Sequence, residues 1–192
     1  MVDIDEILAI EGECFAPGIR ETAETFEDRI KAFPSGFIML DRVGDSPVSR
    51  AETAGYFCSE LWDTIPSALP ERWALGHKAS ERHVARGSVL YVSSFAVLPT
   101  YRGGTGTTFF AEAIASIVSR NPGIRDIAFI VNEEWTAARR IYEHAGFDYI
   151  GTLPGFFPAA NAANAPDAAT APRSRAAALI MTKNIQEGTG CA

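Results

Sequence analysis

A short, basic, glycine-rich turn is the feature of this sequence best suited to chemistry. It lies between an apolar stretch at residues 89–98 and an amphipathic stretch that follows, and it reads Arg102-Gly103-Gly104-Thr105-Gly106-Thr107. Glycines permit backbone angles that other residues avoid, and they let a ligand approach bare amide groups. Where such a turn opens a helix, free N–H groups and the helix dipole attract anions. The turn therefore predicts an anion site, above all for phosphate.

The segments on either side of the turn have the patterns of a strand and of a helix. Residues 89–98 are rich in β-branched and aromatic side chains without a helical period, as is typical of a strand buried on both faces, and Pro99 ends them. After the turn, apolar side chains recur at helical spacing and form one stripe, which consists of Phe109, Phe110, Ala113, Ile114, Ile117 and Val118. A buried strand and an amphipathic helix thus hold the turn.

This arrangement resembles the acetyl-CoA-binding motif of the GNAT (GCN5-related N-acetyltransferase) superfamily, a strand ending in Val-x-Pro followed by Gln/Arg-x-x-Gly-x-Gly/Ala. The strand end at residues 97–99 and Arg102 fit the pattern, while the turn is one residue short. Counted from Arg102, the two glycine positions hold Thr105 and Thr107; counted back from the helix, they hold Gly104 and Gly106. Residues 138–147 resemble the superfamily's second segment, Ala-x-x-x-Tyr-x-x-x-Gly-Phe, and the resemblance covers the chain from Ile4 to Lys183.

The resemblance implies one α/β (α+β) domain over residues 1–192, with a central mixed, mostly antiparallel sheet flanked by helices. The patterns along the chain agree with it. They predict helices that start near Asp3 and Thr25, a helix at 135–145, and strands at 36–41, 54–62, 126–131, 147–153 and 177–182. The superfamily's usual first strand has no counterpart here. Residues 63–87 indicate a long insertion at the mouth of the site, 154–175 a mobile loop and 185–192 a disordered tail.

The resemblance also assigns roles at the site. The backbone N–H of Phe95 would bond the thioester carbonyl of acetyl-CoA, that of Val97 the pantetheine amide, and the amides of the turn the pyrophosphate. Tyr142 matches the tyrosine that protonates the departing thiolate. The expected cofactor-binding residues are Phe95, Ala96, Val97, Arg102, Gly103, Gly104, Thr105, Gly106, Thr107 and, by residue type only, Asn132.

No general base follows from the two motifs. Glu60 is a candidate by its chemistry alone, as are Glu133 and Glu134. Residues 59–63 and 95–97 are similar to arylalkylamine N-acetyltransferases, which place two histidines on the central strand. Since Tyr91 and Ser93 occupy those positions here, a histidine relay is not expected. The predicted catalytic pair is Tyr142 and Glu60.

Composition limits the remaining classes of function. The 192 residues are 47% hydrophobic and 21% charged, which is typical of one globular domain, and the net charge of −7 argues against non-specific nucleic-acid binding. No apolar run approaches a membrane span and the first residues are acidic, so we expect a cytoplasmic protein without a membrane partner. Cys14, Cys58 and Cys191 lack the spacing of a disulfide framework or a metal site.

Three functions remain open. The first is transfer of an acetyl group from acetyl-CoA to a primary amine, with a small molecule favoured because residues 63–87 and 154–175 look suited to closing over something small. The second is acetylation of a protein N-terminus or lysine. The third is acyl-CoA binding without catalysis. The chain is expected to act as a monomer or a homodimer.

Overall fold

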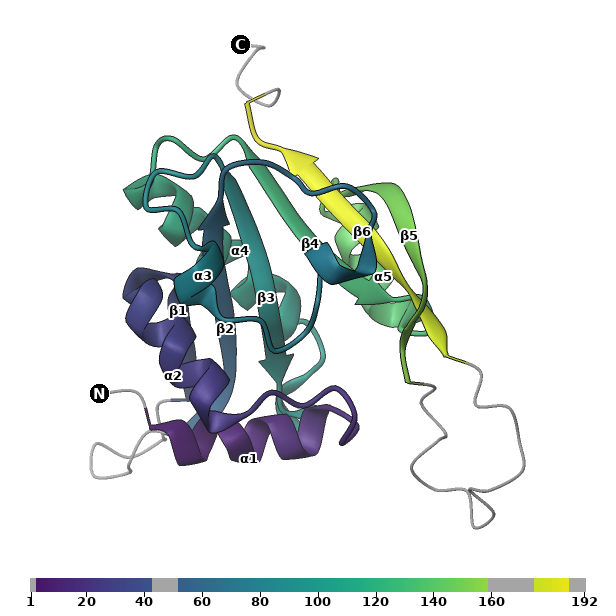
Figure 1. Cartoon of the computed structure of the whole chain (residues 1–192). Coiled ribbons are helices and arrows are strands. Elements are labelled where there is room, and N and C mark those ends of the chain that lie inside the picture. The colour runs from purple at the N-terminus through teal and green to yellow at the C-terminus, as the bar shows by residue number, and fades with distance from the viewer. Residues whose placement is uncertain (1–2, 43–51, 159–174, 187–192) are drawn as a thin grey trace.

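In the computed structural model, which describes residues 3–42, 52–158 and 175–186, a six-stranded sheet carries helices on both faces (Figure 1). The strand order is β1-β2-β3-β4-β6-β5, and every neighbouring pair is antiparallel except β3 and β4. The strands are β1 (Phe37–Arg42), β2 (Glu52–Trp62), β3 (Val89–Val97), β4 (Asp126–Asn132), β5 (Asp148–Phe157) and β6 (Ala176–Asn184). The predicted mixed, mostly antiparallel sheet is confirmed.

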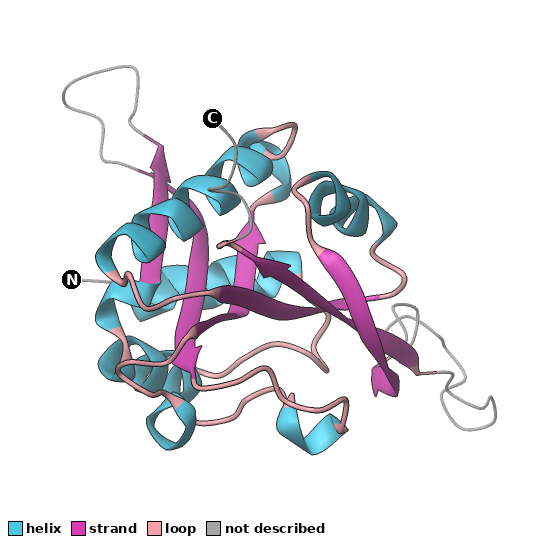
Figure 2. Cartoon of the chain, turned by 90° about the horizontal axis from the view of Figure 1, so that it is seen from above, coloured by secondary structure: helices cyan, strands magenta, loops and turns pink. Residues whose placement is uncertain are grey.

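The α-helices form two layers, one on each side of the sheet (Figure 2). They are α1 (Ile4–Cys14), α2 (Ala23–Ala32), α3 (Ala79–Arg82), α4 (Thr105–Arg120) and α5 (Thr136–His144), and short 3₁₀ turns occur at Pro34–Gly36, Pro70–Arg72 and Pro99–Tyr101. Side chains alternate in direction along a strand. Tyr56 and Cys58 therefore pack with α1 and α2, while Phe57 between them packs with α4.

The ends of the helices follow local sequence signals, with one difference from the expectation. The Asp3 side chain accepts the N–H of Asp5 and caps α1, as its position predicts. The second helix begins earlier than predicted, because Thr22 and not Thr25 is its N-cap and accepts the N–H of Thr25 at 3.2 Å. Gly146, with φ of 80°, follows the end of α5 in the left-handed conformation that favours glycine.

The central parallel pair of strands is short. Only Val89, Leu90 and Tyr91 of β3 have partners on β4, and beyond them the two strands diverge (Figure 1). On its other edge, β3 follows β2 to Val97, with a change of register between Cys58 and Ser59 of β2. The divergence leaves a gap in the sheet between residues 92–97 and the second half of β4.

Residues 63–87 are more ordered than the sequence indicated. They contain the turn at Pro70–Arg72 and α3, and the Trp73 side chain is fully buried against Trp62 and Tyr91. The indole N–H of Trp73 donates to the Ser67 carbonyl at 3.0 Å. This buried anchor explains why a segment rich in polar residues, prolines and glycines keeps a defined path.

The last hairpin also differs from the expectation. β5 continues past Leu153 to Phe157, because Phe157 is buried and pairs with Ala176 on β6. Residues 154–157, which were predicted to belong to a mobile loop at 154–175, are therefore part of β5. Residues 159–174 of that predicted loop lie outside the described part of the chain, as do residues 187–192 of the predicted tail.

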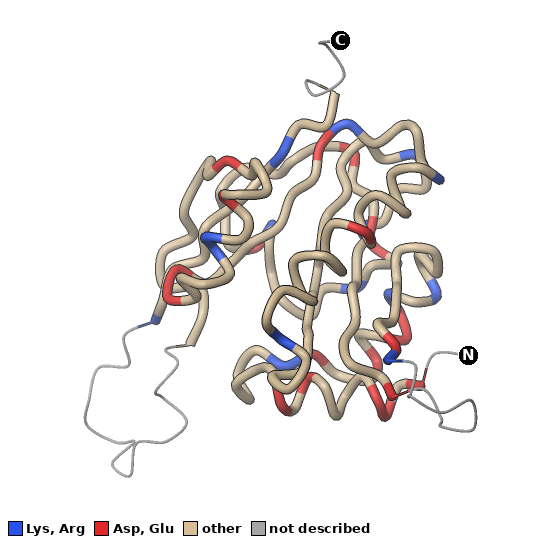
Figure 3. The backbone as a smooth tube through the Cα atoms, turned by 180° about the vertical axis from the view of Figure 1, so that it is seen from behind, with Lys and Arg blue, Asp and Glu red and all other residues tan. Residues whose placement is uncertain are grey.

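Charges of both signs are interspersed along the described backbone, and Lys and Arg gather on none of its elements in Figure 3. No helix in the described ranges is long and apolar enough to cross a membrane.

Candidate active site

The glycine turn presents unpaired amides at the start of α4. Gly103 and Gly104 have φ of 97° and 111°, values that suit glycine, and Gly104 is the N-cap of the helix. The Arg102 amide already donates to the Pro99 carbonyl, and the Thr107 amide to the Gly104 carbonyl. Within the described residues, the amides of Gly103 to Gly106 have no such partner and are free for an anion. The helix begins at Thr105, with Gly104 as its N-cap and Gly106 in its first turn.

Arg102 is fixed at the mouth of the turn. Its Nε donates to the Val97 carbonyl at 3.0 Å, and its Nη2 lies 3.8 Å from the Cys14 thiol. The thiol also donates to the Val97 carbonyl at 3.5 Å, and burial raises its pKa. The guanidinium is otherwise exposed, so its charge is available beside the free amides of the turn.

The predicted amides of β3 face the gap between β3 and β4. Leu98, directly after β3, donates its N–H to the carbonyl of Ala54 on β2 at 2.9 Å. Since N–H direction alternates along a strand, the amides of Phe95 and Val97 point to the opposite edge, toward β4. The Val97 carbonyl, which accepts from Arg102 and Cys14, points the same way. The backbone from Phe95 to Val97 can therefore bond a ligand that lies in the gap.

Two cavities meet in this gap. The outer cavity, about 570 Å³, extends from the glycine turn past Phe95, Ala96 and Val97 to α5. The inner cavity, about 80 Å³, lies on the α1 side and is lined by Glu11, Glu21, Ser93 and Ser94 together with apolar side chains. Both are lined by Phe15, Phe95, Phe110, Trp135 and Tyr142. The two cavities therefore adjoin at these five side chains, one of which is Tyr142.

Tyr142 is held by aromatic side chains at this junction. Its ring centroid lies 4.6 Å from that of Phe129 and 5.1 Å from that of Phe110. Burial raises the pKa of its phenol to about 12, so the hydroxyl keeps its proton at neutral pH. The structure thus places the predicted acid where the two cavities meet.

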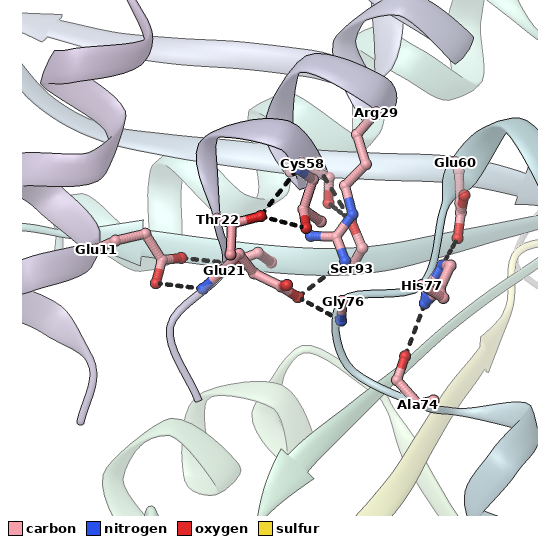
Figure 4. Close-up of polar contacts among 12 residues, drawn as sticks. Glu11, Glu21, Thr22, Arg29, Cys58, Glu60, Ala74, Gly76, His77 and Ser93 are labelled. Atoms are coloured by element: carbon pink, nitrogen blue, oxygen red, sulfur yellow. Dashed lines mark hydrogen bonds and ion pairs between the residues drawn. The ribbon is translucent and has the colours of Figure 1, made fainter. Parts of the chain in front are cut away.

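Glu11 is the ionisable group of the inner cavity that sequence reasoning missed. It lies near the end of α1 and is buried, with 2% of its surface exposed. Its Oε1 accepts the hydroxyl of Tyr56 and lies 3.4 Å from that of Ser94. Its Oε2 accepts the Glu21 N–H at 3.4 Å (Figure 4). Burial raises the pKa of Glu11 to about 7, although the Tyr56 hydrogen bond lowers it. A carboxyl that titrates near neutral pH is suited to general base catalysis.

Glu60 lies elsewhere. It lines neither cavity; it is fully buried, and its Oε1 bonds His77 and accepts the Trp62 indole N–H at 2.9 Å (Figure 4). His77 in turn bonds the Ala74 carbonyl through Nδ1 at 2.8 Å. Glu60 therefore ties residues 74–77 to β2, a positioning role that its chemistry alone did not indicate.

Of the other residues that the sequence suggested, Glu134 lines the outer cavity, whereas Asn132 and Glu133 accept hydrogen bonds from backbone amides. Asn132 is buried at the end of β4, and its side-chain oxygen accepts the Glu134 N–H at 2.9 Å, so it shapes the turn into α5 and does not line the outer cavity. Glu133 accepts the Ala177 N–H at 2.6 Å. Glu134 lines the outer cavity and is exposed. No group of three or more His, Cys, Asp or Glu in the described ranges could hold a metal ion.

Comparison with known proteins identifies the fold. No protein-family model and no curated protein matches the sequence. The ribosomal-protein-S18-alanine N-acetyltransferase from Escherichia coli is 17% identical, with a TM-score of 0.62 over 99% of this chain and 93% of that chain. Arabidopsis thaliana NAA60 in complex with acetyl-CoA is 18% identical, with a TM-score of 0.66 over 96% and 94%. The loading GNATL domain of CurA from Lyngbya majuscula is 14% identical, with a TM-score of 0.69 over 96% and 94%. The chain has the GNAT fold; a closer likeness to arylalkylamine N-acetyltransferases stays a prediction.

Proposed function

We propose that this chain, which has the GNAT fold, transfers an acetyl group from acetyl-CoA to a small primary amine. The observation that carries the proposal is the meeting of two cavities at Tyr142. One cavity begins at the free amides of a helix start, and the other contains a carboxyl with a pKa of about 7. Acyl transfer to an amine needs an anchored donor, a base for the ammonium proton and stabilisation of the leaving thiolate.

The outer cavity fits acetyl-CoA in its chemistry. The amides from Gly103 to Gly106, the start of α4 and the Arg102 guanidinium would hold the pyrophosphate. The Val97 N–H would bond an amide of the pantetheine arm, and the Phe95 N–H the thioester carbonyl. This order along β3 places the reacting carbonyl at the inner end of the outer cavity, beside Tyr142.

Glu11 would activate the amine. A primary amine enters as an ammonium ion, which binds the ionised carboxylate of Glu11 and then gives up a proton to it, directly or through one water. The free amine attacks the thioester carbonyl carbon, and the Phe95 N–H stabilises the oxyanion that forms. The C–S bond then breaks, the nitrogen gives its remaining surplus proton to water, the carbonyl re-forms as a neutral amide, and the thiolate departs toward Tyr142.

Tyr142 would act at this last step. Its pKa of about 12 lies above that of a thiol, about 8.5, so a hydrogen bond to the thiolate is favoured over complete transfer of the proton. The hydrogen bond lowers the energy of the charge as it develops on sulfur. The thiolate takes its proton as CoA leaves the dry junction.

The small size of the inner cavity favours a small amine over a protein substrate. Its volume is only about 80 Å³, against about 570 Å³ for the outer cavity. A peptide would need an open groove in the same place. Acetylation of a protein N-terminus or lysine is therefore the second candidate.

The test is release of free CoA thiol from acetyl-CoA with a panel of small amines and peptides, beside a thermal-shift titration of acetyl-CoA. We expect a rise in melting temperature with acetyl-CoA and turnover with small amines. Turnover with peptides alone would favour the protein substrate. Binding without turnover of any amine would indicate acyl-CoA binding without catalysis, and no binding at millimolar acetyl-CoA would refute the proposal.

A further inference from the structure

We infer that the acceptor is a primary monoamine with an apolar body, which carries neither an anionic group nor a second cation. This inference rests on the proposed function and narrows it to one chemical class. It follows from the charge, the walls and the volume of the inner cavity.

The charge of the inner cavity comes from a single unpaired carboxylate. Glu21, the second acidic residue that lines it, is neutralised, because Arg29 Nη2 lies 2.9 Å from its Oε1 and both side chains are buried. Glu11 has no such ion pair within the described residues; it accepts hydrogen bonds from two hydroxyls and an amide. No Lys or Arg of the described ranges lines the cavity. One ammonium group is therefore matched by Glu11, whereas a carboxylate or phosphate on the amine would be buried without a partner.

Apart from the hydroxyls of Ser93, Ser94 and Tyr142, the remaining walls of the cavity are apolar, and they come from distant parts of the chain. The Trp135 ring centroid lies 5.9 Å from that of Phe15 and 5.8 Å from that of Phe157. Ile19 and Leu75 extend this surface on the side of Glu21. Such a surface binds the hydrocarbon part of an amine and gives a second charged group no hydrogen-bond partner.

The wall that Leu75 contributes is anchored on both sides. The Gly76 N–H donates to Glu21 Oε1 at 3.2 Å, and His77 bonds Glu60 on β2 (Figure 4). The ion pair between Glu21 and Arg29 therefore has two effects. It neutralises a charge in the cavity, and it orients the carboxylate that accepts the Gly76 N–H. The space that remains, about 80 Å³, suits a small amine.

The experiment compares three six-carbon amines that differ only at the far end: hexylamine, 1,6-diaminohexane and 6-aminohexanoate. Steady-state release of CoA thiol gives kcat/KM for each. We expect hexylamine to exceed 6-aminohexanoate by about a hundredfold and the diamine by about tenfold, because an unpaired buried charge is costly. Equal values, or a preference for either charged amine, would overturn the inference while leaving the proposed function intact. Failure of every amine would instead refute the proposed function.

A variant tests the same inference by a change in the ratio of kcat/KM between two amines, whatever the value of that ratio in the parent. Leu75→Arg places a cation at the edge of the inner cavity and should raise the kcat/KM ratio of 6-aminohexanoate to hexylamine at least tenfold. Leu69→Arg, at an exposed position that lines neither cavity, is the matched control and should leave the ratio unchanged. An unchanged ratio in a folded Leu75→Arg protein would show that the acceptor does not occupy the inner cavity.

Discussion

Replacing Glu11 with glutamine separates its cost to the fold from its use in catalysis. Burial raises the pKa of Glu11 from an ordinary 4.5 to about 7, so the folded state holds a proton that the unfolded state has lost. The contribution of Glu11 to the free energy of unfolding is complete below about pH 4.5 and is lost as the pH rises through about 7. At about 1.36 kcal/mol for each pH unit, the loss is about 3 kcal/mol. Glutamine mimics the protonated side chain and can accept the same hydroxyl of Tyr56.

We therefore expect Glu11→Gln to unfold like the parent at pH 4.5 and to be more stable at pH 8 by up to about 3 kcal/mol. Urea unfolding followed by circular dichroism at pH 4.5, 6, 7 and 8 measures the difference. Glu13→Gln removes a carboxylate from an exposed position of the same helix and should show no comparable pH dependence. A constant difference between Glu11→Gln and the parent from pH 4.5 to 8 would refute the shifted pKa.

The same variant tests the role in catalysis. General base catalysis typically contributes 10²–10⁴-fold, so kcat/KM for an amine should fall by about that factor, with unchanged affinity for acetyl-CoA. The fall in rate below a pKa of about 7 should also disappear from the pH profile of kcat/KM, because the group that titrates there is gone. Parent-like turnover by a more stable variant would make Glu11 a structural residue and leave the base unassigned.

Three further perturbations test other parts of the structure. Tyr142→Phe keeps the ring against Phe129 and Phe110, so stability and acetyl-CoA affinity should hold while kcat falls by about 10²-fold or more; a parent-like kcat would make Tyr142 only a packing residue. Gly104→Asp puts a carboxylate at the free amides of the turn and should abolish the stabilisation of about 2.7 kcal/mol that acetyl-CoA provides at 100 times its Kd. The control Gly123→Asp, beyond the other end of α4, should retain that stabilisation. A thermal shift retained in Gly104→Asp would mean that the phosphates bind elsewhere. Trp73→Ala empties a fully buried site and should lower the free energy of unfolding, measured in urea, by about 3–5 kcal/mol. The control Leu69→Ala, at an exposed position, should lower it by less than about 0.5 kcal/mol. Similar losses in the two variants would show that the indole does not anchor residues 63–87.

The sequence predicted the elements that carry their own local signals. The strand at residues 89–98 has a β-branched and aromatic run, α4 has a stripe of apolar residues at helical spacing, and Gly146 ends α5. Each signal lies within a few residues of the structure that it specifies. The glycine turn was found for the same reason, since it lies directly before the start of α4.

The base, the buried tryptophan and the extent of β5 depend on contacts between distant residues. Glu11 meets Tyr56 and Ser94, which lie 45 and 83 residues away in the sequence, and on its own helix it is one of several acidic residues. The burial of Trp73 depends on Trp62 and Tyr91, and β5 reaches Phe157 because β6 pairs with it. Local patterns contain no information about these contacts. Glu60 was predicted from the chemistry of its carboxylate alone, and that carboxylate is bonded to His77 and to the Trp62 indole N–H.

The short pairing of β3 with β4 also bears on the solubility of the protein. Open strand edges recruit other chains and lead to aggregation. Here the unpaired edge from Val92 to Val97, roughly 20 Å long at about 3.3 Å per residue, lies inside the sheet and stops at the pairing of Tyr91 with Ala128. An invading strand that ran past Val92 would collide with that pairing. Because the gap lies inside the sheet, a short extended ligand can pair with this edge, whereas the long β segments from which aggregates grow cannot.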